Sequence, residues 1–468
     1  MLDILSKNNP KNIAIIKNNF SKTYSELEKD IKFLKCKFNK GEVILLLCDS
    51  SYESIIIYLA CLQASSIPLL LSDNISQEMI LEYERRYLPS QIFSPKIIDL
   101  GRKEDAVLEG YFVYSTSNKC VVKNKNLALL LTTSGSTGNP KVVKVSRKNL
   151  IANTKSICKY LKLSEKDRHI TTLPMNYTYG LSCINTFLYS GGSIILNSNA
   201  ITTKEFWTNL ENYHPTHLAG VPYTYEILSR YFLNKLKNSS IKVFTQAGGK
   251  LSNNFIEKFL KFSEETQKEF IIMYGQTEAT ARMSYLPFNK LKQKIGSIGK
   301  AIPGGKFSLR NIYKEKSFNK KIGELVYEGE NVTDGYANTF DDLDYIKENN
   351  FKLNTGDIAW IDEDNYVFLL GRINRFAKIN GIRVSLVDVE NIISKLGYPC
   401  AVISDDIDLK VYIEIPDKIS LDMNKMKKEI TSKINISPNS INLTRRARLP
   451  RIESGKIDYK AMEHKNFE

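Results

Sequence analysis

Apolar runs and amphipathic stretches alternate along the first third of the chain. The segment at 41–48, which is apolar from Val43 onward, and the apolar segment at 127–131 predict buried strands. Residues 52–64 between them predict a helix, and so does the segment that begins at Thr23, where Thr23 and Glu26 fit a capping box. This alternation predicts βαβ units, in which a parallel sheet is covered by helices.

The same rhythm continues through the middle of the chain. The pattern predicts a helix over 146–161 and strands at 168–173, 218–221, 241–245 and 271–274. Loops that follow parallel strands meet at one edge of the sheet, where ligands of such folds bind. We therefore expect the residues that follow these strands to lie close together.

The last part of the chain predicts a β-rich region and then a small separate unit. Residues 323–336 predict a β subdomain, while a helix at 386–396 and strands at 401–403 and 409–415 predict an α+β unit. The expected fold class is α/β. It comprises a large N-terminal domain of helix-covered, mainly parallel sheets plus a β subdomain, and a small α+β C-terminal domain.

The composition is typical of a soluble globular protein. Of 468 residues, 42% are hydrophobic and 25% are charged. The N-terminus lacks the apolar core and cleavage site of a signal peptide. Gln63, Ser65, Ser66 and Pro68 interrupt the most apolar stretch, so we expect no membrane span. The seven cysteines form no CxxC pair and predict reduced core residues of a cytoplasmic protein.

The formal net charge of +15 has two interpretations. Abundant Lys, Asn and Ile favour a general compositional bias, in which lysine is simply a common surface residue. Alternatively, the charge attracts polyanions such as ATP, CoA or an acidic carrier protein. Nucleic acid is not expected as a partner, because no known binding module is present.

A loop rich in small hydroxyl residues follows the strand at 127–131. Residues 131–141 have the sequence Leu-Thr-Thr-Ser-Gly-Ser-Thr-Gly-Asn-Pro-Lys. Glycines let a backbone turn sharply, and hydroxyl and N–H groups suit phosphate oxygens. Pro140 before Lys141 excludes a Walker A loop, which has Gly-Lys-Ser/Thr at this point. A flexible linker of the same composition is the alternative.

Five segments, in family order, resemble motifs of the adenylate-forming (AMP-binding) superfamily, which includes acyl-CoA synthetases, carrier-protein-loading adenylation domains and luciferases. They are the loop at 131–141, Tyr-Gly-Gln-Thr-Glu-Ala-Thr at 274–280, Thr-Gly-Asp at 355–357, 371–383 and 449–458. Each motif taken singly has an ordinary alternative, such as a turn with a surface glutamate or a solvated lysine. Together they cover nearly the whole chain.

The resemblance implies two domains and a set of residue roles. The N-terminal adenylation domain would span 1–372, and a mobile C-terminal domain carrying the catalytic lysine would span 373–468. Lys456, Thr277 and Glu278 would be catalytic, with Glu278 as the metal ligand for Mg²⁺.

The same resemblance implies three binding regions. The ATP site would comprise Thr133, Ser134, Gly135, Ser136, Thr137, Gly138, Lys141, Gly248, Gly249, Tyr274, Gly275, Gln276, Asp357, Arg372 and Lys456. The acyl-substrate pocket would comprise Tyr177, Thr178, Val221 and Gly249. The thiol tunnel would contain Lys378 and Gly381, and the hinge would be Asn374, where the family usually has Asp or Lys.

The expected acyl pocket departs from that of amino-acid-activating members. Tyr177 replaces the usual His or Phe, and Thr178 stands where those members place an Asp that pairs with the α-amine. A neutral hydroxyl cannot neutralise a buried ammonium group, so an α-amino acid is not the expected substrate. A plain aromatic core is an equal alternative for Tyr177 and Tyr179.

A metal site at the histidines is not expected. His214 and His217 are two of only four histidines, and no cysteine or acidic cluster accompanies them. We expect the pair to lie just before the strand at 218–221.

The implied function is that of a cytoplasmic ligase that activates a carboxylic acid with ATP and Mg²⁺ and transfers the acyl group to a thiol. CoA and the phosphopantetheine of an acidic acyl or peptidyl carrier protein remain equal as acceptors. Three alternatives stay open: transfer to an amine or hydroxyl, activation of an amino acid, or a non-catalytic nucleotide-binding protein. Glu278, Asp357 and Lys456 argue against the last.

Replacement of the expected catalytic lysine tests the two half-reactions separately. Lys456→Ala should lower adenylate formation by roughly a hundredfold or more, the scale of losing one oriented transition-state partner. Thiol transfer from a supplied acyl-adenylate should change much less, because the resemblance has this lysine act only in the first step. Single-turnover assays of each half-reaction measure the effect, and equal losses in both would contradict the assignment.

Overall fold

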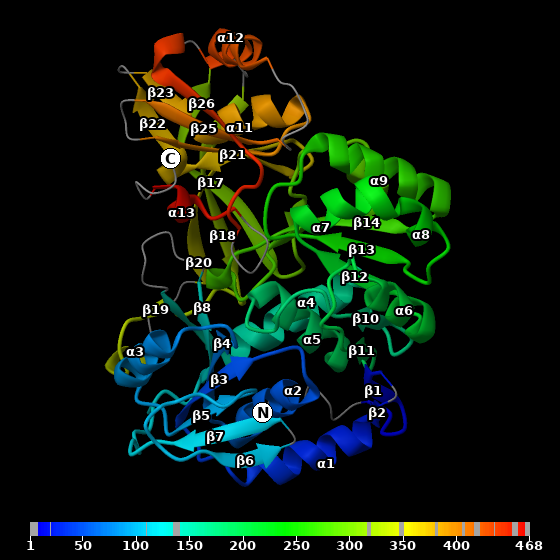
Figure 1. Ribbon diagram of the computed structural model, residues 1–468, viewed down its shortest axis with the longest axis vertical. Coiled ribbons are helices and arrows are strands. Elements are labelled where there is room, and N and C mark those ends of the chain that lie inside the picture. Colours follow the sequence, from blue (N-terminus) through cyan, green and yellow to red (C-terminus); the bar gives the residue numbers. More distant parts are fainter. Residues whose placement is uncertain are drawn as a thin grey trace.

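The structure is a computed structural model that describes residues 8–18, 20–108, 110–133, 141–315, 320–345, 351–379, 382–404, 408–415, 422–434, 436–451 and 457–463. In Figure 1 the N-terminal sheet and its helices lie at the bottom, a second sheet lies at the right, and the C-terminal region lies at the top. Among the described residues, no helix combines the length and the apolar character that a membrane crossing requires.

The N-terminal sheet is built on the apolar runs of the first third of the chain. Its central strands are parallel, and antiparallel strands close both edges. The strand order is β19 (Tyr336–Ala337), β9 (Val142–Ser146), β8 (Leu127–Thr132), β4 (Ile67–Ser72), β3 (Val43–Cys48), β5 (Gln91–Ser94), β7 (Tyr111–Ser115) and β6 (Asp105–Leu108). β3 is buried at every position, as expected for a parallel strand that is covered on both faces.

Helices cover both faces of this sheet. They are α1 (Tyr24–Lys35), α2 (Tyr52–Ala64) and α3 (Gln77–Tyr87). α1 and α2 pack on one face, and α3 packs on the other. The predicted capping box is confirmed, because the Thr23 side chain accepts from the Glu26 N–H while the Glu26 carboxylate accepts from the Thr23 N–H.

The second sheet carries the loops of interest. Its strand order is β16 (Lys300–Ala301), β15 (Ser284–Leu286), β14 (Glu269–Tyr274), β13 (Val243–Gln246), β12 (His217–Gly220), β10 (Arg168–Ile170), β11 (Ser193–Ile195), β1 (Ile13–Lys17) and β2 (Phe20–Thr23). The strands from β14 to β1 are parallel. Their carboxyl ends therefore meet at one edge, as the sequence predicts.

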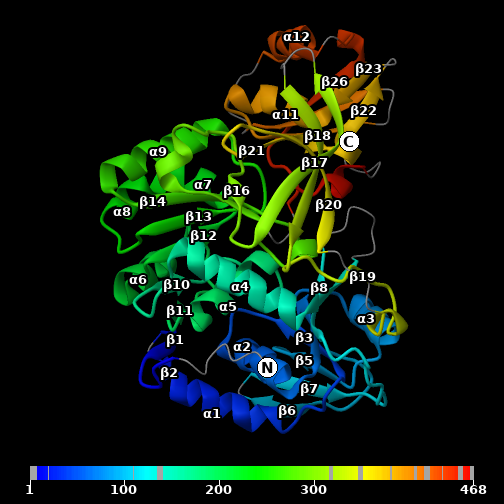
Figure 2. The same cartoon turned by 180° about the vertical axis from the view of Figure 1, so that it is seen from behind.

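Two helices fill the space between the two sheets. α4 (Arg147–Leu161) and α5 (Thr178–Tyr189) pack against each other there, as Figure 2 shows from behind. The remaining helices around the second sheet are α6 (Lys204–Tyr213), α7 (Pro222–Ile227), the π-helix Leu228–Phe232, α8 (Leu233–Lys237), α9 (Asn253–Thr266) and α10 (Phe288–Leu291).

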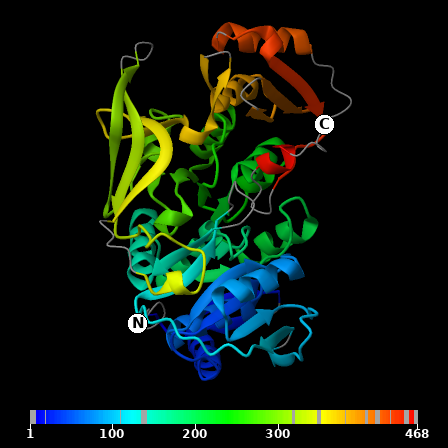
Figure 3. The same cartoon turned by 90° about the vertical axis from the view of Figure 1, so that its left-hand side faces the viewer.

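An antiparallel sheet and a small α+β unit complete the fold. The sheet has the order β17 (Gly305–Glu315), β18 (Lys320–Gly329), β20 (Lys352–Ile361) and β21 (Val367–Arg372). The small unit contains β22 (Phe376–Ile379), β23 (Ile382–Ser385), α11 (Leu386–Lys395), β24 (Cys400–Ser404), β25 (Leu409–Glu414), α12 (Met423–Ile434), β26 (Ile441–Arg446) and α13 (Tyr459–Glu463). It has its own apolar core and stands apart from the antiparallel sheet in Figure 3.

The partners of the chain change abruptly between the antiparallel sheet and the small unit. Arg372 donates to the Asp357 carboxylate in β20. Arg375, three residues later, donates to the Val402 carbonyl and to the Glu390 carboxylate, both in the small unit. This change supports a boundary directly after Arg372, which we keep as a proposal.

Four sequence predictions need correction. The strand predicted at 168–173 ends at Ile170. The Thr171 N–H still donates to the Ile195 carbonyl, but the hydroxyls of Thr171 and Thr172 bond to the Asn197 and Ala219 carbonyls, so side chains take over part of the strand pairing here. Asp357, which the Thr-Gly-Asp motif predicts at the end of a strand, lies inside β20, because pairing with β18 continues on both sides of it. His217 is the first residue of β12, not a residue before it. Cys36 is exposed at the end of α1, outside the core.

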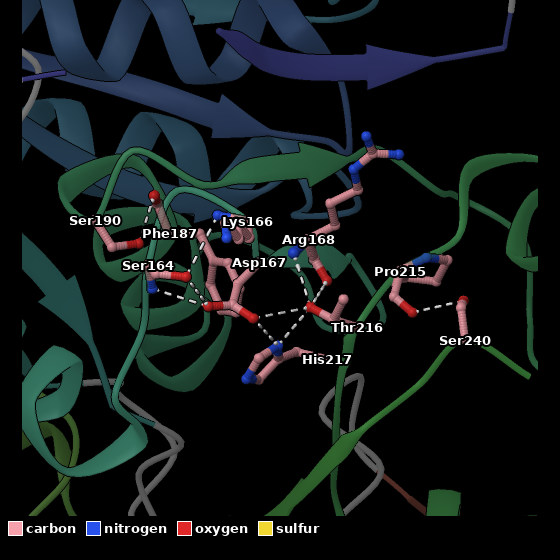
Figure 4. A network of polar contacts seen from close by, with 10 residues as sticks. All are labelled: Ser164, Lys166, Asp167, Arg168, Phe187, Ser190, Pro215, Thr216, His217 and Ser240. Carbon is pink, nitrogen blue, oxygen red and sulfur yellow. Dashed lines mark hydrogen bonds and ion pairs between the residues drawn. The ribbon is translucent and has the colours of Figure 1, made fainter. Parts of the chain in front are cut away.

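Two buried histidines lie side by side in the second sheet. His169 in β10 and His217 in β12 are paired in register, and the ring centroid of each lies 5.1 Å from that of Phe187. His217 Nδ1 is 2.8 Å from Thr216 Oγ1 and 3.7 Å from Asp167 Oδ1 (Figure 4). Burial lowers the pKa of His169 to about 3. Burial also lowers the pKa of His217 to about 4, against the opposing effect of Asp167.

These histidines make folding stability depend on pH. The unfolded chain protonates its histidines near pH 6.5, whereas the folded chain keeps this pair neutral down to about pH 4. Their contribution to stability is therefore complete above pH 6.5. It is lost as the pH falls, by up to about 1.4 kcal/mol per pH unit for each histidine.

Urea unfolding at a series of pH values between neutral and pH 5 measures this loss. The His169→Gln and His217→Gln variants should show a shallower decline of the unfolding free energy than the unmodified protein. The exposed His214 provides a matched control in His214→Asn, which should leave the decline unchanged. Equal declines in all four proteins would contradict the prediction.

Candidate active site

The candidate residues gather where the parallel strands of the second sheet end. Val221 follows β12, Gly248 follows β13, and Tyr274 ends β14. Tyr177 precedes α5 in the connection from β10. Because these strands are parallel, the segments that follow them lie together at one edge of the sheet.

A very tight turn follows β14. A Cβ atom on Gly275 would lie 1.7 Å from the Ala281 carbonyl oxygen, so only glycine fits at this position. The turn contains the short 3₁₀ helix Thr277–Ala279, and the Met283 N–H returns to the Tyr274 carbonyl at 2.8 Å. The turn therefore holds Thr277 and Glu278 at a fixed place on the sheet edge.

A polar cluster lies at the side of this turn that faces the antiparallel sheet. The Asp357 carboxylate accepts hydrogen bonds from Tyr274 Oη at 2.5 Å, from Gln276 Nε2 at 3.0 Å and from Arg372 Nε at 3.0 Å. Burial and the nearby Asp357 raise the pKa of Tyr274 well above its usual range, so its phenol remains a donor. The buried carboxylate accepts these three hydrogen bonds, which leaves about one of its roughly four acceptor positions for a ligand hydroxyl, such as one hydroxyl of the diol expected at Asp357.

A hydroxyl pair connects the turn to the expected acyl pocket. Thr178 Oγ1 at the start of α5 lies 3.0 Å from Thr277 Oγ1. Gly248 has φ +86°, and a Cβ there would meet the Tyr177 hydroxyl at 2.5 Å and a Val221 methyl at 3.2 Å. Tyr177, Thr178, Val221 and the strand-end glycine therefore form one wall, and Thr277 touches it.

Glu278 is held by groups from outside its own motif. Tyr336 in β19 donates its hydroxyl to Glu278 Oε1 at 2.6 Å. The Thr333 N–H and hydroxyl both donate to the Glu278 carbonyl. Asn331 Nδ2 donates to the Ala279 carbonyl at 2.9 Å. The loop after β18 therefore fixes the backbone on which this carboxylate stands.

The same tyrosine connects Glu278 with the hydroxyl-rich loop. Lys141 Nζ lies 4.9 Å from the centroid of the Tyr336 ring. At the base of the loop, the Thr133 N–H donates to the Lys141 carbonyl at 2.9 Å, so the two ends of the loop are adjacent. The loop thus begins and ends beside the side chain expected to hold a metal.

Several expected site residues lie outside the described residues. They are Ser134, Gly135, Ser136, Thr137, Gly138, Gly381 and Lys456. Only the backbone is described for Asn374, in the short helix Ile373–Arg375, and for Lys378 in β22.

The chain on either side of the Lys456 segment is placed. Arg451 and Ile457, the described residues on either side of Lys456, form a β-bridge and therefore lie side by side. The Arg451 guanidinium carbon lies 4.7 Å from the centroid of the Tyr223 ring in α7. This bridge is therefore close to the start of α7, where Gly249 faces Pro222, the residue that follows Val221 of the pocket wall.

Tyr336 and Asn331 are functional candidates that the sequence analysis missed. They lie more than fifty residues after the turn they support, and nothing in their local sequence marks them. Only the pairing of β19 with β9 and the fold of the loop after β18 bring them to the site.

The donor set around Glu278 fits a magnesium ion that arrives with a nucleotide. Within the described ranges, no three His, Cys, Asp or Glu side chains converge as a closed metal site. Mg²⁺ is commonly held by one or two carboxylates plus substrate phosphates and water. One carboxylate beside a hydroxyl-rich loop is such an arrangement.

Comparisons with known proteins identify a family match and a shared fold. The sequence profile of the family described as "AMP-binding enzyme" matches residues 5–337. An oxalate–CoA ligase of Arabidopsis thaliana is 26% identical over 411 residues, which cover 81% of this chain and 76% of the relative.

Two solved structures share the fold. ATP-bound MatB from Rhodopseudomonas palustris has a TM-score of 0.79 at 19% identity and covers 100% of this chain and 98% of its own. O-succinylbenzoate coenzyme A synthetase (MenE) from Bacillus subtilis, in complex with ATP and magnesium ion, has a TM-score of 0.74 at 18% identity, with 97% and 96% covered. The predicted α/β fold, with a large N-terminal and a smaller C-terminal domain, is confirmed.

Removing the negative charge of Glu278 should weaken metal binding. Glu278→Gln should raise the Mg²⁺ concentration for half-maximal ATP–pyrophosphate exchange by roughly tenfold or more, because a neutral amide is a poorer ligand for a hard cation. Glu330→Gln, an exposed glutamate on the neighbouring loop, is the matched control and should not shift the requirement. An unchanged Mg²⁺ dependence in Glu278→Gln would remove Glu278 from the metal site.

Proposed function

The chain belongs to the AMP-binding enzyme family, and within that family we propose that it is an AMP-forming acid–thiol ligase. It would activate a carboxylic acid with ATP and then pass the acyl group to a thiol. The observation that carries this proposal is the contact of 3.0 Å between Thr277 Oγ1 and Thr178 Oγ1. It joins the hydroxyl expected at the α-phosphate to the pocket expected to hold the acid.

In the proposed first step, the carboxylate oxygen of the acid attacks the α-phosphorus of ATP. The bond from that phosphorus to pyrophosphate breaks, which leaves an acyl-adenylate and free pyrophosphate. Negative charge spreads over the transferring phosphoryl group, so positioning and electrostatic stabilisation dominate the barrier. Bound Mg²⁺ would supply charge neutralisation at the phosphates.

Different residues of the protein would position the nucleotide, the metal ion and the reacting phosphate in this first step. Asp357 and Tyr274 would hold the ribose and adenine, and Thr277 would donate to the α-phosphate. Lys141 and the hydroxyl-rich loop at 131–141 would face the departing pyrophosphate. Glu278, oriented by Tyr336 at 2.6 Å, would present its second oxygen to the cation. Lys456 would approach the α-phosphate from the segment whose base lies beside Tyr223.

In the proposed second step, the sulfur of a thiol attacks the acyl carbonyl and AMP leaves with the electron pair of the broken acyl–phosphate bond. The similarity to a relative named oxalate–CoA ligase favours coenzyme A as the thiol. A carrier protein's phosphopantetheine presents the same thiol arm, and we propose Lys378 and Gly381 for its channel in either case. Between the two steps, the small C-terminal domain would rotate about the hinge at Asn374. The proposed location of the protein is the cytoplasm.

Two assays test the proposed function. ATP–pyrophosphate exchange with a panel of carboxylic acids tests adenylation, and thioester formation with coenzyme A tests the acceptor. Exchange without thioester formation, but with product on hydroxylamine or an amine, would favour the alternative acceptors. Absence of exchange with every acid, despite ATP binding, would leave a non-catalytic nucleotide-binding protein.

The pocket wall predicts that α-amino acids are poor substrates. An α-ammonium beside Thr178 would meet hydroxyl, aromatic and apolar groups, and leaving a buried charge unpaired costs several kcal/mol. We expect the deaminated analogue of each amino acid to give about a hundredfold or higher kcat/KM in pyrophosphate exchange. Thr178→Asp should narrow this difference in kcat/KM, while Thr202→Asp at an exposed position is the control. A higher kcat/KM for any amino acid than for its analogue would overturn the prediction.

A further inference from the structure

A buried arginine lies just behind the wall of the acyl pocket. Arg282 follows the tight turn and directly precedes Met283, and its side chain is buried with 3% of the residue exposed. Its carbonyl accepts from Asn153 Nδ2 at 2.9 Å and from Asn331 Nδ2 at 3.3 Å, which fixes its backbone. The proposed function gives this residue no role.

The guanidinium has only weak, neutral partners. Nη1 lies 3.2 Å from the Tyr160 hydroxyl and 3.5 Å from Met273 Sδ, and Nη2 lies 3.3 Å from Cys183 Sγ. The guanidinium carbon is 5.0 Å from the centroid of the Tyr179 ring. Nε is buried without a partner among the described atoms.

No anion within the described part of the chain balances this charge. Arg282 takes part in none of the ion pairs formed there, all of which involve other residues. Burial raises the pKa of the Cys183 thiol and of the Tyr160 phenol despite the adjacent guanidinium, so neither is an anion near neutral pH. An arginine remains charged under all such conditions, and an unpaired buried charge is strongly unfavourable.

The position of Arg282 relative to the pocket suggests what supplies the missing charge. Three of its contacts (Tyr179, Cys183 and Met273) belong to the apolar cluster against which Tyr177 packs. Tyr179 meets Tyr177 edge to face, with 6.3 Å between the ring centroids. The guanidinium is therefore one side-chain layer behind the pocket wall, and the unbranched Met273 that partly covers it is an adaptable side chain.

We propose that Arg282 binds a carboxylate at the far end of the substrate, so that the enzyme activates dicarboxylic acids. One carboxylate would react at Thr277, and the other would replace the thioether and thiol as the partner of the guanidinium fork. Arg–carboxylate pairs are commonly bidentate and much stronger than hydrogen bonds to sulfur. This proposal rests on the proposed function, since it concerns the acid that the same pocket receives.

The first test needs only the unmodified protein. ATP–pyrophosphate exchange is measured with α,ω-dicarboxylic acids of increasing chain length, each paired with its monomethyl ester, which keeps one reactive carboxylate. We expect at least one dicarboxylic acid to exceed its half-ester by roughly a hundredfold in kcat/KM, the scale of losing one partner of a buried charge pair. Half-esters or simple fatty acids that equal or exceed every dicarboxylic acid would overturn the inference.

Variants then assign the preference to Arg282. Arg282→Gln should abolish the preference mainly through KM for the diacid, with activity on the half-ester retained, and Arg282→Lys should restore part of it. Arg230→Gln, on the exposed π-helix, removes the same charge at the surface and should change nothing. A purely structural arginine would lower kcat for both members of each pair equally, and this result would contradict the proposal.

A third measurement tests the inference without any variant, in case the Arg282 variants do not fold. Thermal unfolding of the unmodified protein with ATP should shift upward with the preferred dicarboxylic acid and much less with its half-ester. An equal shift with both would overturn the inference. The outcomes also separate the two proposals: exchange with acids that lack a distal charge at a kcat/KM equal to or above that of every dicarboxylic acid refutes the role of Arg282 alone, whereas no exchange with any acid refutes the proposed function.

Discussion

The space at Gly275 is the constraint on which the site depends. The Ala281 carbonyl stands 1.7 Å from where a Cβ would be, so the chain after β14 can double back at once into β15. This closure places the phenol of Tyr274, the hydroxyl of Thr277, the carboxylate of Glu278 and the guanidinium of Arg282 within nine residues. Any larger residue at 275 would displace all four groups at the same time.

The turn is also the place where residues connected to the antiparallel sheet contact the edge of the parallel sheet. Asn331 donates to the carbonyls of Ala279 and Arg282, and Thr333 donates to that of Glu278. Tyr327 in β18 holds Asn331 in place through its hydroxyl at 2.9 Å. The turn has backbone hydrogen bonds of its own, and the loop after β18 adds side-chain bonds to its outward-facing carbonyls. The parallel sheet provides the edge, and the loop after β18 of the antiparallel sheet helps to fix the turn on it.

Local sequence predicted those parts of the molecule that depend on local physics. The capping box at Thr23, the helix over 52–64 and the sheet edge that collects the candidate loops all follow from patterns within a few residues. Tyr336, Asn331 and Arg282 could not be found in this way. Their importance comes from what lies against them, and contacts between residues far apart in sequence leave no local pattern. Asp357 depends on both kinds of information. Its motif is recognisable in the local sequence, whereas its place inside β20 depends on strand pairing.

Glu278, Asp357 and Arg282, the charged groups of the site, are each held by neutral or partly exposed partners. A ligand can therefore still interact with each charge. A phenol orients Glu278, and a phenol, an amide and the exposed Arg372 orient Asp357. Around Arg282, a phenol, a thiol and a thioether do the same for a positive charge. Neutral partners, a donor at Glu278 and acceptors at Arg282, fix the direction of the charged group without neutralising it. The low-dielectric surroundings make the remaining charge more attractive to a complementary ion. A site built in this way is most stable when its ligands are bound. On this argument the cation at Glu278 and the anion at Arg282 are two instances of one principle, in which the substrates complete the electrostatics that the fold leaves open.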